Sequence, residues 1–168
     1  LQPGSVEAYV TSNVDYLNLA RQYGRVGGFA HLATLIKQER AAYPDRTILL
    51  DAGDSWYGSA IALRTEGKAP LEAMNAMGYE AMTLHWEFNL GSETLLARIG
   101  EANFPVMAQN LVDTDFEDRV LPTNSLVKDF GDVKVAVVGQ AYPFSMLTTE
   151  LRDANPNWRM GYREDILQ

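Results

Sequence analysis

Residues 47–54, Thr-Ile-Leu-Leu-Asp-Ala-Gly-Asp, decide the fold of this chain. A short apolar run rich in β-formers is followed at once by two aspartates and a glycine, which favour turns. This pattern predicts a buried strand over Thr47–Leu50 that stops at a loop carrying Asp51 and Asp54. An aspartate after a strand is commonly a turn former or a helix cap, so the spacing alone leaves a chemical role for Asp54 open.

Outward from this strand, helical and extended patterns alternate. Apolar spacing of i, i+3, i+4 and i+7 indicates helices, and short apolar runs indicate strands. The predicted order is a helix over residues 29–40, the strand Thr47–Leu50, a helix over Ala69–Met77, a strand over Tyr79–Thr83, a helix capped by Ser92, and a strand over Phe104–Ala108. This alternation predicts a layered α/β domain with at least some parallel strands, whose functional groups lie at the carboxyl ends of those strands.

The pattern changes in the last third of the chain. Two apolar stretches, Ser125–Phe130 and Val133–Val138, flank the dipeptide Gly131-Asp132. A two-residue connection of this kind predicts a β-hairpin. The complete sheet structure is therefore expected to be mixed.

Composition excludes several classes of function. The chain has 168 residues with 14 basic and 22 acidic side chains, a formal net charge of −8, which argues against a nucleic-acid backbone binder. It has no cysteine, which removes disulfides, cysteine zinc sites and thiol catalysis by this chain. No apolar run is long enough to predict a membrane span. The two histidines, His31 and His85, are too few for a metal site built wholly of imidazoles.

Two loops follow neighbouring predicted strands, at Gly53–Trp56 and at His85–Phe88. If the strands are parallel, both loops open at the same sheet edge, and Asp54 and His85 can approach one another. A carboxylate can bridge two divalent cations and a neutral imidazole can complete one coordination shell. The alternative for His85 is a packed, hydrogen-bonded histidine without a ligand.

Several separated blocks carry a family resemblance, and they occur in the family's order: Tyr23–Ala30, Leu49–Trp56, His85–Phe88, Val138–Phe144 and Trp158–Arg163. Together they resemble the SoxB-type thiosulfohydrolases, within the 5′-nucleotidase-like branch of the metallophosphoesterase superfamily. The resemblance implies a partial metallophosphoesterase-like sandwich, with mixed sheets flanked by helices. It also implies that residues 1–22 are an irregular leader and that residues 23–168 are part of a catalytic domain whose C-terminal half and second domain are absent.

The block at His85 is the most informative. Nucleotidases of this superfamily carry Gly-Asn-His-Glu here, in which asparagine binds metal and histidine assists the leaving group. This chain has His85 at the ligand position and Trp86 at the acid position, and an indole is no proton donor to a leaving oxygen. Asn89 replaces the aspartate that usually orients the catalytic histidine. A thiolate leaves with little protonation because a thiol is far more acidic than an alcohol, so these replacements suit cleavage of a sulfur–sulfur bond.

The resemblance implies a reaction, a cofactor and a partner. Water would attack the terminal sulfonate of a cysteine S-thiosulfonate on the SoxYZ carrier protein in the periplasm, and sulfate would leave. Asp54 would bridge two manganese ions and His85 would bind one, with Glu87 as a structural acceptor that fixes the loop. Four further residues lie in family blocks and are candidates for contact with an anionic substrate or the carrier: Arg25, Gln140, Tyr142 and Arg163. For each of these four, a surface or packing role is an equal alternative.

The ligand set implied by the family is incomplete in this sequence. The family's Asp-x-His motif should precede Tyr23, but residues 1–22 contain no histidine, and the remaining histidine ligands belong beyond Gln168. We therefore expect the isolated chain to be inactive even where the parent enzyme is active. Two alternatives stay open, a 5′-nucleotidase-like phosphoesterase and a non-catalytic module that binds the carrier. The sequence identifies no catalytic side chain.

Overall fold

The computed structural model describes residues 16–24, 27–116 and 118–161. The chain divides into two compact units, residues 1–47 and residues 48–168. The first unit contains the helices α2 (Tyr16–Tyr23) and α3 (Phe29–Ala42), and α3 confirms the helix predicted from Phe29. Of the predicted leader, residues 1–15 lie outside the described residues, and its last seven residues form most of α2.

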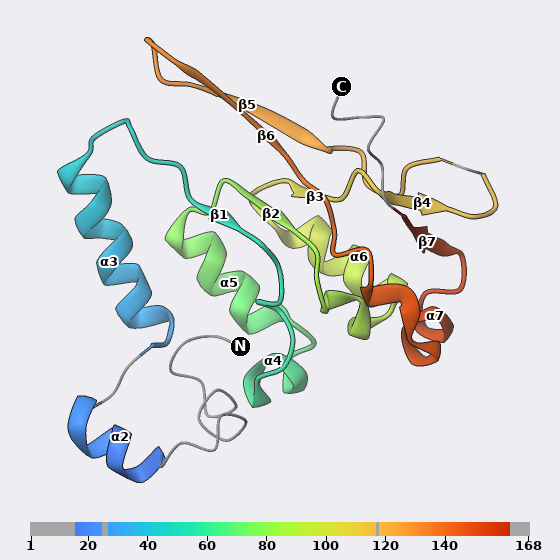
Figure 1. The fold of residues 1–168 in the computed structure, drawn as a ribbon, viewed down its shortest axis with the longest axis horizontal. Coiled ribbons are helices and arrows are strands. Elements are labelled where there is room, and N and C mark those ends of the chain that lie inside the picture. Colours follow the sequence, from blue (N-terminus) through green and yellow to red (C-terminus); the bar gives the residue numbers. More distant parts are fainter. Residues whose placement is uncertain (1–15, 25–26, 117, 162–168) are drawn as a thin grey trace. The chain divides into compact units, whose positions relative to one another are not determined.

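The second unit is built on a three-stranded parallel sheet in the order β1-β2-β3 (Figure 1). Its strands are short: β1 is Leu50–Asp51, β2 is Ala81–Thr83 and β3 is Val106–Met107. Helix α5 (Lys68–Met77) connects β1 to β2, and α6 (Ser92–Glu101) connects β2 to β3. The predicted strand–helix–strand–helix–strand order and its parallel pairing are therefore confirmed, and the turns after β1 and β2 lie at one sheet edge.

Two local expectations need correction, and one short helix was not predicted. The first strand begins at Leu50 and includes Asp51, whereas Thr47–Leu49 precede it. Ser92 does not cap α6; Gly91 is the N-cap because its φ of 75° lets the chain turn out of the preceding 3-10 helix, Glu87–Leu90. A short helix that the apolar spacing did not indicate, α4 (Ala60–Arg64), follows β1, and the Ser59 hydroxyl caps it by accepting from the Ala62 amide.

Two antiparallel pairs complete the mixed sheet structure. Strands β5 (Ser125–Asp129) and β6 (Lys134–Val138) form the predicted hairpin. Its turn closes with a 2.9 Å hydrogen bond from the Phe130 amide to the Val133 carbonyl, and Gly131 supplies the positive φ that the turn needs. The pairing of β4 (Leu111–Asp113) with β7 (Trp158–Met160) joins segments far apart in sequence. Between β6 and β7 lie the 3-10 helix η2 (Ser145–Leu147) and the helix α7 (Thr149–Ala154).

The core of the second unit lies around α5, α6 and the loops after β1 and β2. Its largest fully buried apolar side chains are Trp56, Phe88, Leu71, Met74, Met82, Leu84, Leu95, Met107, Leu111 and Leu121. The Trp56 indole donates to the Met74 sulfur at 3.2 Å, which ties the first loop to α5. These contacts give the site-bearing loops a rigid support.

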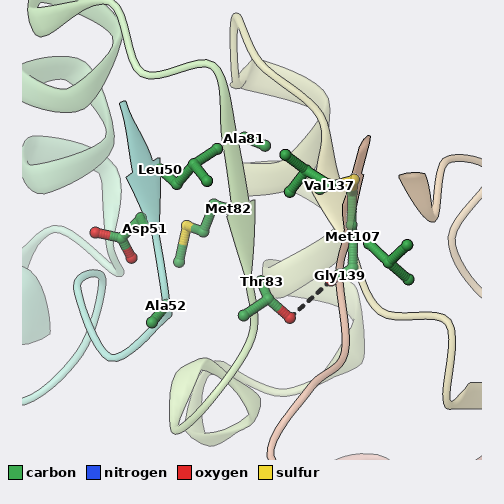
Figure 2. A pocket seen from close by; sticks show the side chains of 10 residues that line it. Leu50, Asp51, Ala52, Ala81, Met82, Thr83, Met107, Val137 and Gly139 are labelled. Carbon is green, nitrogen blue, oxygen red and sulfur yellow. Dashed lines mark hydrogen bonds between the residues drawn. The ribbon is translucent and has the colours of Figure 1, made fainter. Parts of the chain in front are cut away.

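A cavity of about 270 Å³ lies where the parallel sheet meets the end of β6 (Figure 2). Its lining is largely apolar and includes Met82, Met107 and Val137, and the Thr83 hydroxyl donates to the Met107 carbonyl at 2.8 Å beside it. Neither Asp54 nor His85 lines this cavity. The cavity borders the candidate site described next, because Asp51 and Ala52 at the start of the Asp54 loop are among its lining residues.

Candidate metal centre

Asp54 and His85 meet at the carboxyl edge of the parallel sheet. Asp54 Oδ2 lies 3.8 Å from His85 Nδ1, and the two side chains are 37% and 29% exposed. Asp54 follows β1 and His85 follows β2, so the parallel pairing of these strands brings together two residues 31 positions apart. The approach expected from the sequence is confirmed, while a metal-binding role for the two residues stays a prediction.

The two loops can approach this closely because residue 53 is glycine. A Cβ at Gly53 would lie 2.7 Å from the His85 backbone nitrogen and 2.9 Å from the Thr83 carbonyl oxygen, distances that side chains do not tolerate. Its φ of 90° is also a conformation that L-residues avoid. Asp54 itself has a φ of 68°, which is uncommon for a residue other than glycine and is typical of strained functional positions.

Asp51 fixes the start of the same loop. Its carboxylate accepts from the Gly53 amide at 2.9 Å and from the Ser55 hydroxyl at 3.0 and 3.1 Å. Burial raises the pKa of Asp51, although the hydrogen bonds from Gly53 and Ser55 counteract this effect. The carboxylate of Asp51 therefore stabilises the turn that presents Asp54.

Glu87 connects the two loops through hydrogen bonds to its side chain. Its fully buried carboxylate accepts from the Ser55 amide at 2.8 Å, the Trp56 amide at 3.3 Å and the His85 amide at 2.8 Å. Burial raises the pKa of Glu87, and these backbone donors counteract the effect by stabilising the charged form. Glu87 is thus the structural acceptor that the sequence analysis predicts, and its donors come from both loops.

The His85 ring contacts two aromatic side chains. The Tyr142 ring is tilted by 39° against it with centroids 4.6 Å apart, and Trp86 presents an edge at 5.4 Å. The Ser145 hydroxyl donates to the His85 carbonyl at 2.5 Å. Among the described residues, the buried Nδ1 of His85 has no hydrogen-bond partner. A buried polar atom without a partner is an exception that calls for a ligand or another acceptor.

These donors fit one part of a metal site. Imidazole and carboxylate suit divalent ions such as manganese, iron or zinc, and ligand bonds of about 2.1 Å can span donor atoms up to about 4.2 Å apart. The 3.8 Å separation of Asp54 Oδ2 and His85 Nδ1 lies within that limit. Within residues 16–24, 27–116 and 118–161, however, no group of three or more histidine, cysteine, aspartate or glutamate side chains is placed to hold a metal. The residues present supply part of a coordination shell.

The four candidates for substrate or carrier contact divide into two pairs. Tyr142 lies at the site, against His85, and Gln140 lies two residues before it on the same loop, where its Oε1 is 3.4 Å from Gln109 Nε2. Arg25 and Arg163 lie outside the described residues. The structure therefore gives two of the four a position.

Sequence reasoning missed the residue that holds this third loop. Buried Asn110 donates to the Ala141 carbonyl at 2.8 Å and accepts from the Ala141 amide at 2.9 Å. The Tyr142 amide then donates to the Leu84 carbonyl, directly before His85. A signal existed, since Asn110 follows the strand β3 as Asp54 and His85 follow β1 and β2.

Comparison with known proteins identifies the fold. The chain superposes on the calcineurin-like phosphoesterase YfkN from Bacillus subtilis with a TM-score of 0.59 and 28% identity, covering 71% of this chain and 42% of that one. It superposes on the sulfate thiohydrolase SoxB from Thermus thermophilus, in complex with glycerol, with a TM-score of 0.81 and 26% identity, covering 97% and 33%. The chain thus has the calcineurin-like phosphoesterase fold, which confirms the expected partial sandwich.

Sequence comparison leads to the same group of hydrolases. The chain is 35% identical to human 5′-nucleotidase over 148 residues, which cover 84% of this chain and 24% of the human protein. No family model matches the chain. Its relatives and structural neighbours are 5′-nucleotidase-like phosphoesterases, with SoxB among the structures, and the chain spans about a quarter of the human relative's length. No helix in the described part of the chain is long and apolar enough to cross a membrane.

Proposed function

We propose that this chain is part of a metal-dependent thiosulfohydrolase, which releases sulfate from a cysteine S-thiosulfonate on the SoxYZ carrier protein in the periplasm. The observation that carries the proposal is the sequence His85-Trp86 at the carboxyl end of β2, with the imidazole 3.8 Å from the carboxylate of Asp54. Residues 23–168 would form part of the catalytic domain of a longer protein. The similarity to the SoxB structure supports this proposal.

In the proposed site, Asp54 and His85 would bind metal, with Asp54 bridging two manganese ions. Bound divalent ions activate water as a nucleophile and stabilise the negative charge that develops on the attacked group. Glu87 and Gly53 hold the two ligand-bearing loops at the observed separation. These residues set the geometry before any substrate binds.

Trp86 favours a leaving group that needs no proton. The water oxygen would bond to the terminal sulfonate sulfur and its two protons would pass to solvent. The sulfur–sulfur bond would break, and its electron pair would stay on the carrier's sulfur as a persulfide anion. No oxidant is needed, because the electron pair simply leaves with the sulfur. An ordinary phosphate ester would release an alkoxide, whose much higher basicity calls for the acid that Trp86 cannot supply.

A 5′-nucleotidase-like phosphoesterase is the second candidate, favoured by the 35% identity to human 5′-nucleotidase. The two candidate functions differ in the substrate that the protein would hydrolyse. The full-length protein that carries this chain is incubated with thiosulfonate-loaded carrier or with AMP, and released sulfate and phosphate are measured. Sulfate release without phosphate release would support the thiosulfohydrolase, whereas the reverse would establish the nucleotidase. Carrier binding with neither product and no bound manganese would identify a non-catalytic module.

Matched variants test the metal ligands directly. Asp54→Asn suits this test because asparagine tolerates the positive φ at this position, so the change removes charge and leaves the backbone conformation accessible. Manganese content should fall sharply in Asp54→Asn and in His85→Gln. Glu72→Gln, at an exposed position on α5, should retain it. Full occupancy in either ligand variant would refute that residue's assignment.

A further inference from the structure

We propose that Tyr142 is a positioning residue that holds the His85 imidazole with Nδ1 directed at Asp54. The inference rests on the proposed metal-binding role of His85. It gives Tyr142 a task different from substrate contact, because its ring packs against the imidazole with centroids 4.6 Å apart. The ring, and not the hydroxyl, is the part that carries this task.

The backbone of His85 is fixed, but its side chain needs a separate support. The His85 amide donates to Glu87 and its carbonyl accepts from Ser145. Neither contact limits rotation of the ring about its own side-chain bonds. Metal-binding histidines are usually oriented by a hydrogen bond from the ring nitrogen that does not bind the metal. Among the described residues, no side chain or backbone group makes such a bond to the His85 ring, which instead contacts the aromatic rings of Tyr142 and Trp86.

Tyr142 is itself held in place from both sides. Its amide donates to the Leu84 carbonyl at 3.1 Å, and the preceding residue, Ala141, makes two hydrogen bonds with buried Asn110. The Phe144 ring packs against Tyr142 at 5.4 Å in an edge-to-face arrangement. A ring held by such a loop can restrict the orientation of the neighbouring imidazole, since packed aromatic pairs favour a few orientations.

A pair of variants separates the ring from the hydroxyl. Tyr142→Phe keeps the ring and removes the hydroxyl, whereas Tyr142→Leu removes the ring. Phe116→Leu, at an aromatic residue 77% exposed in the loop after β4, is the control for loss of a surface ring. Each is made in the full-length protein that carries this chain. Manganese affinity is measured by titration calorimetry with manganese chloride alone, and the His85 Nδ1 to Asp54 Oδ2 distance is measured in metal-free crystals.

We expect Tyr142→Leu to weaken manganese binding about tenfold or more and to turn the imidazole away from Asp54. Tyr142→Phe and Phe116→Leu should stay within about twofold of the wild type, as expected where no contact to the ligand changes. Unchanged ring orientation and affinity in Tyr142→Leu would overturn the inference, and so would an equal loss in Tyr142→Phe. If the wild type binds no manganese, the proposed function fails, and the ring orientation in the crystals still decides whether Tyr142 positions His85.

Discussion

Replacement of Glu87 by alanine should destabilise the fold strongly, even without metal. The change leaves three backbone amides, those of Ser55, Trp56 and His85, without their carboxylate acceptor. A buried donor left unpaired costs about 1–3 kcal/mol. Two effects reduce this loss. Ser55 and His85 are only part-buried, so water can pair with their amides in part. Burial also raises the pKa of Glu87, and alanine removes the cost of burying that carboxylate. The expected loss of unfolding free energy is on the order of 3 kcal/mol.

Urea unfolding followed by tryptophan fluorescence measures this loss, because buried Trp56 lies at the perturbed loop. With a slope of about 1–3 kcal/mol per molar urea, the midpoint should fall by about 1 M or more. Glu87→Gln, which keeps one acceptor oxygen, should show an intermediate loss. Glu72→Ala on the exposed side of α5 is the control and should change stability by less than about 0.5 kcal/mol. A Glu87→Ala midpoint equal to that of the control would refute the proposed role of the carboxylate.

Three further perturbations test other parts of the site. Gly53→Ala should destabilise the chain more than Gly58→Ala. The two glycines have nearly the same φ, 90° and 91°, but of these two positions only 53 would place a Cβ within 4 Å of other atoms. Equal losses of stability in urea unfolding would contradict the packing argument. Asn110→Ala should lower the free energy of unfolding by about 2–4 kcal/mol and speed hydrogen exchange at the Ala141 amide, since it removes both hydrogen bonds to that residue. An unchanged exchange rate would show that other contacts hold the loop. Asp54→Gly should change stability by less than about 1 kcal/mol, because glycine relieves the φ of 68°, while manganese binding by the full-length protein is lost; calorimetry showing normal binding would exclude Asp54 as a ligand.

The sequence predicted those parts of the fold that depend on local periodicity. Helix α3 and the β5–β6 hairpin were predictable because apolar spacing and the Gly131-Asp132 turn act over neighbouring residues. The meeting of Asp54 and His85 followed from the parallel order of two strands, a property of topology. These features require no knowledge of packing.

Other features depend on contacts that no local pattern encodes. Helix α4 has only five residues, too few for a clear apolar period, although Ser59 was a usable cap signal. The β4–β7 pair joins strands separated by more than forty residues of chain. The N-cap of α6 is Gly91 and not Ser92, because the preceding 3-10 helix fixes where the chain must turn. The packing of Tyr142 on His85 involves a loop whose Ala141 is bonded to Asn110, and residue spacing did not indicate this contact.

The carboxylate of Glu87 has a consequence for anyone who would redesign this protein. Because one side chain receives the amides of both loops, the segment around Asp54 and the segment around His85 form a single transplantable unit, although 31 residues separate Asp54 from His85. Grafting either loop alone onto another parallel sheet would transfer the ligand without its support. A successful graft would carry Gly53, Asp54, His85 and Glu87 together, on two adjacent strands.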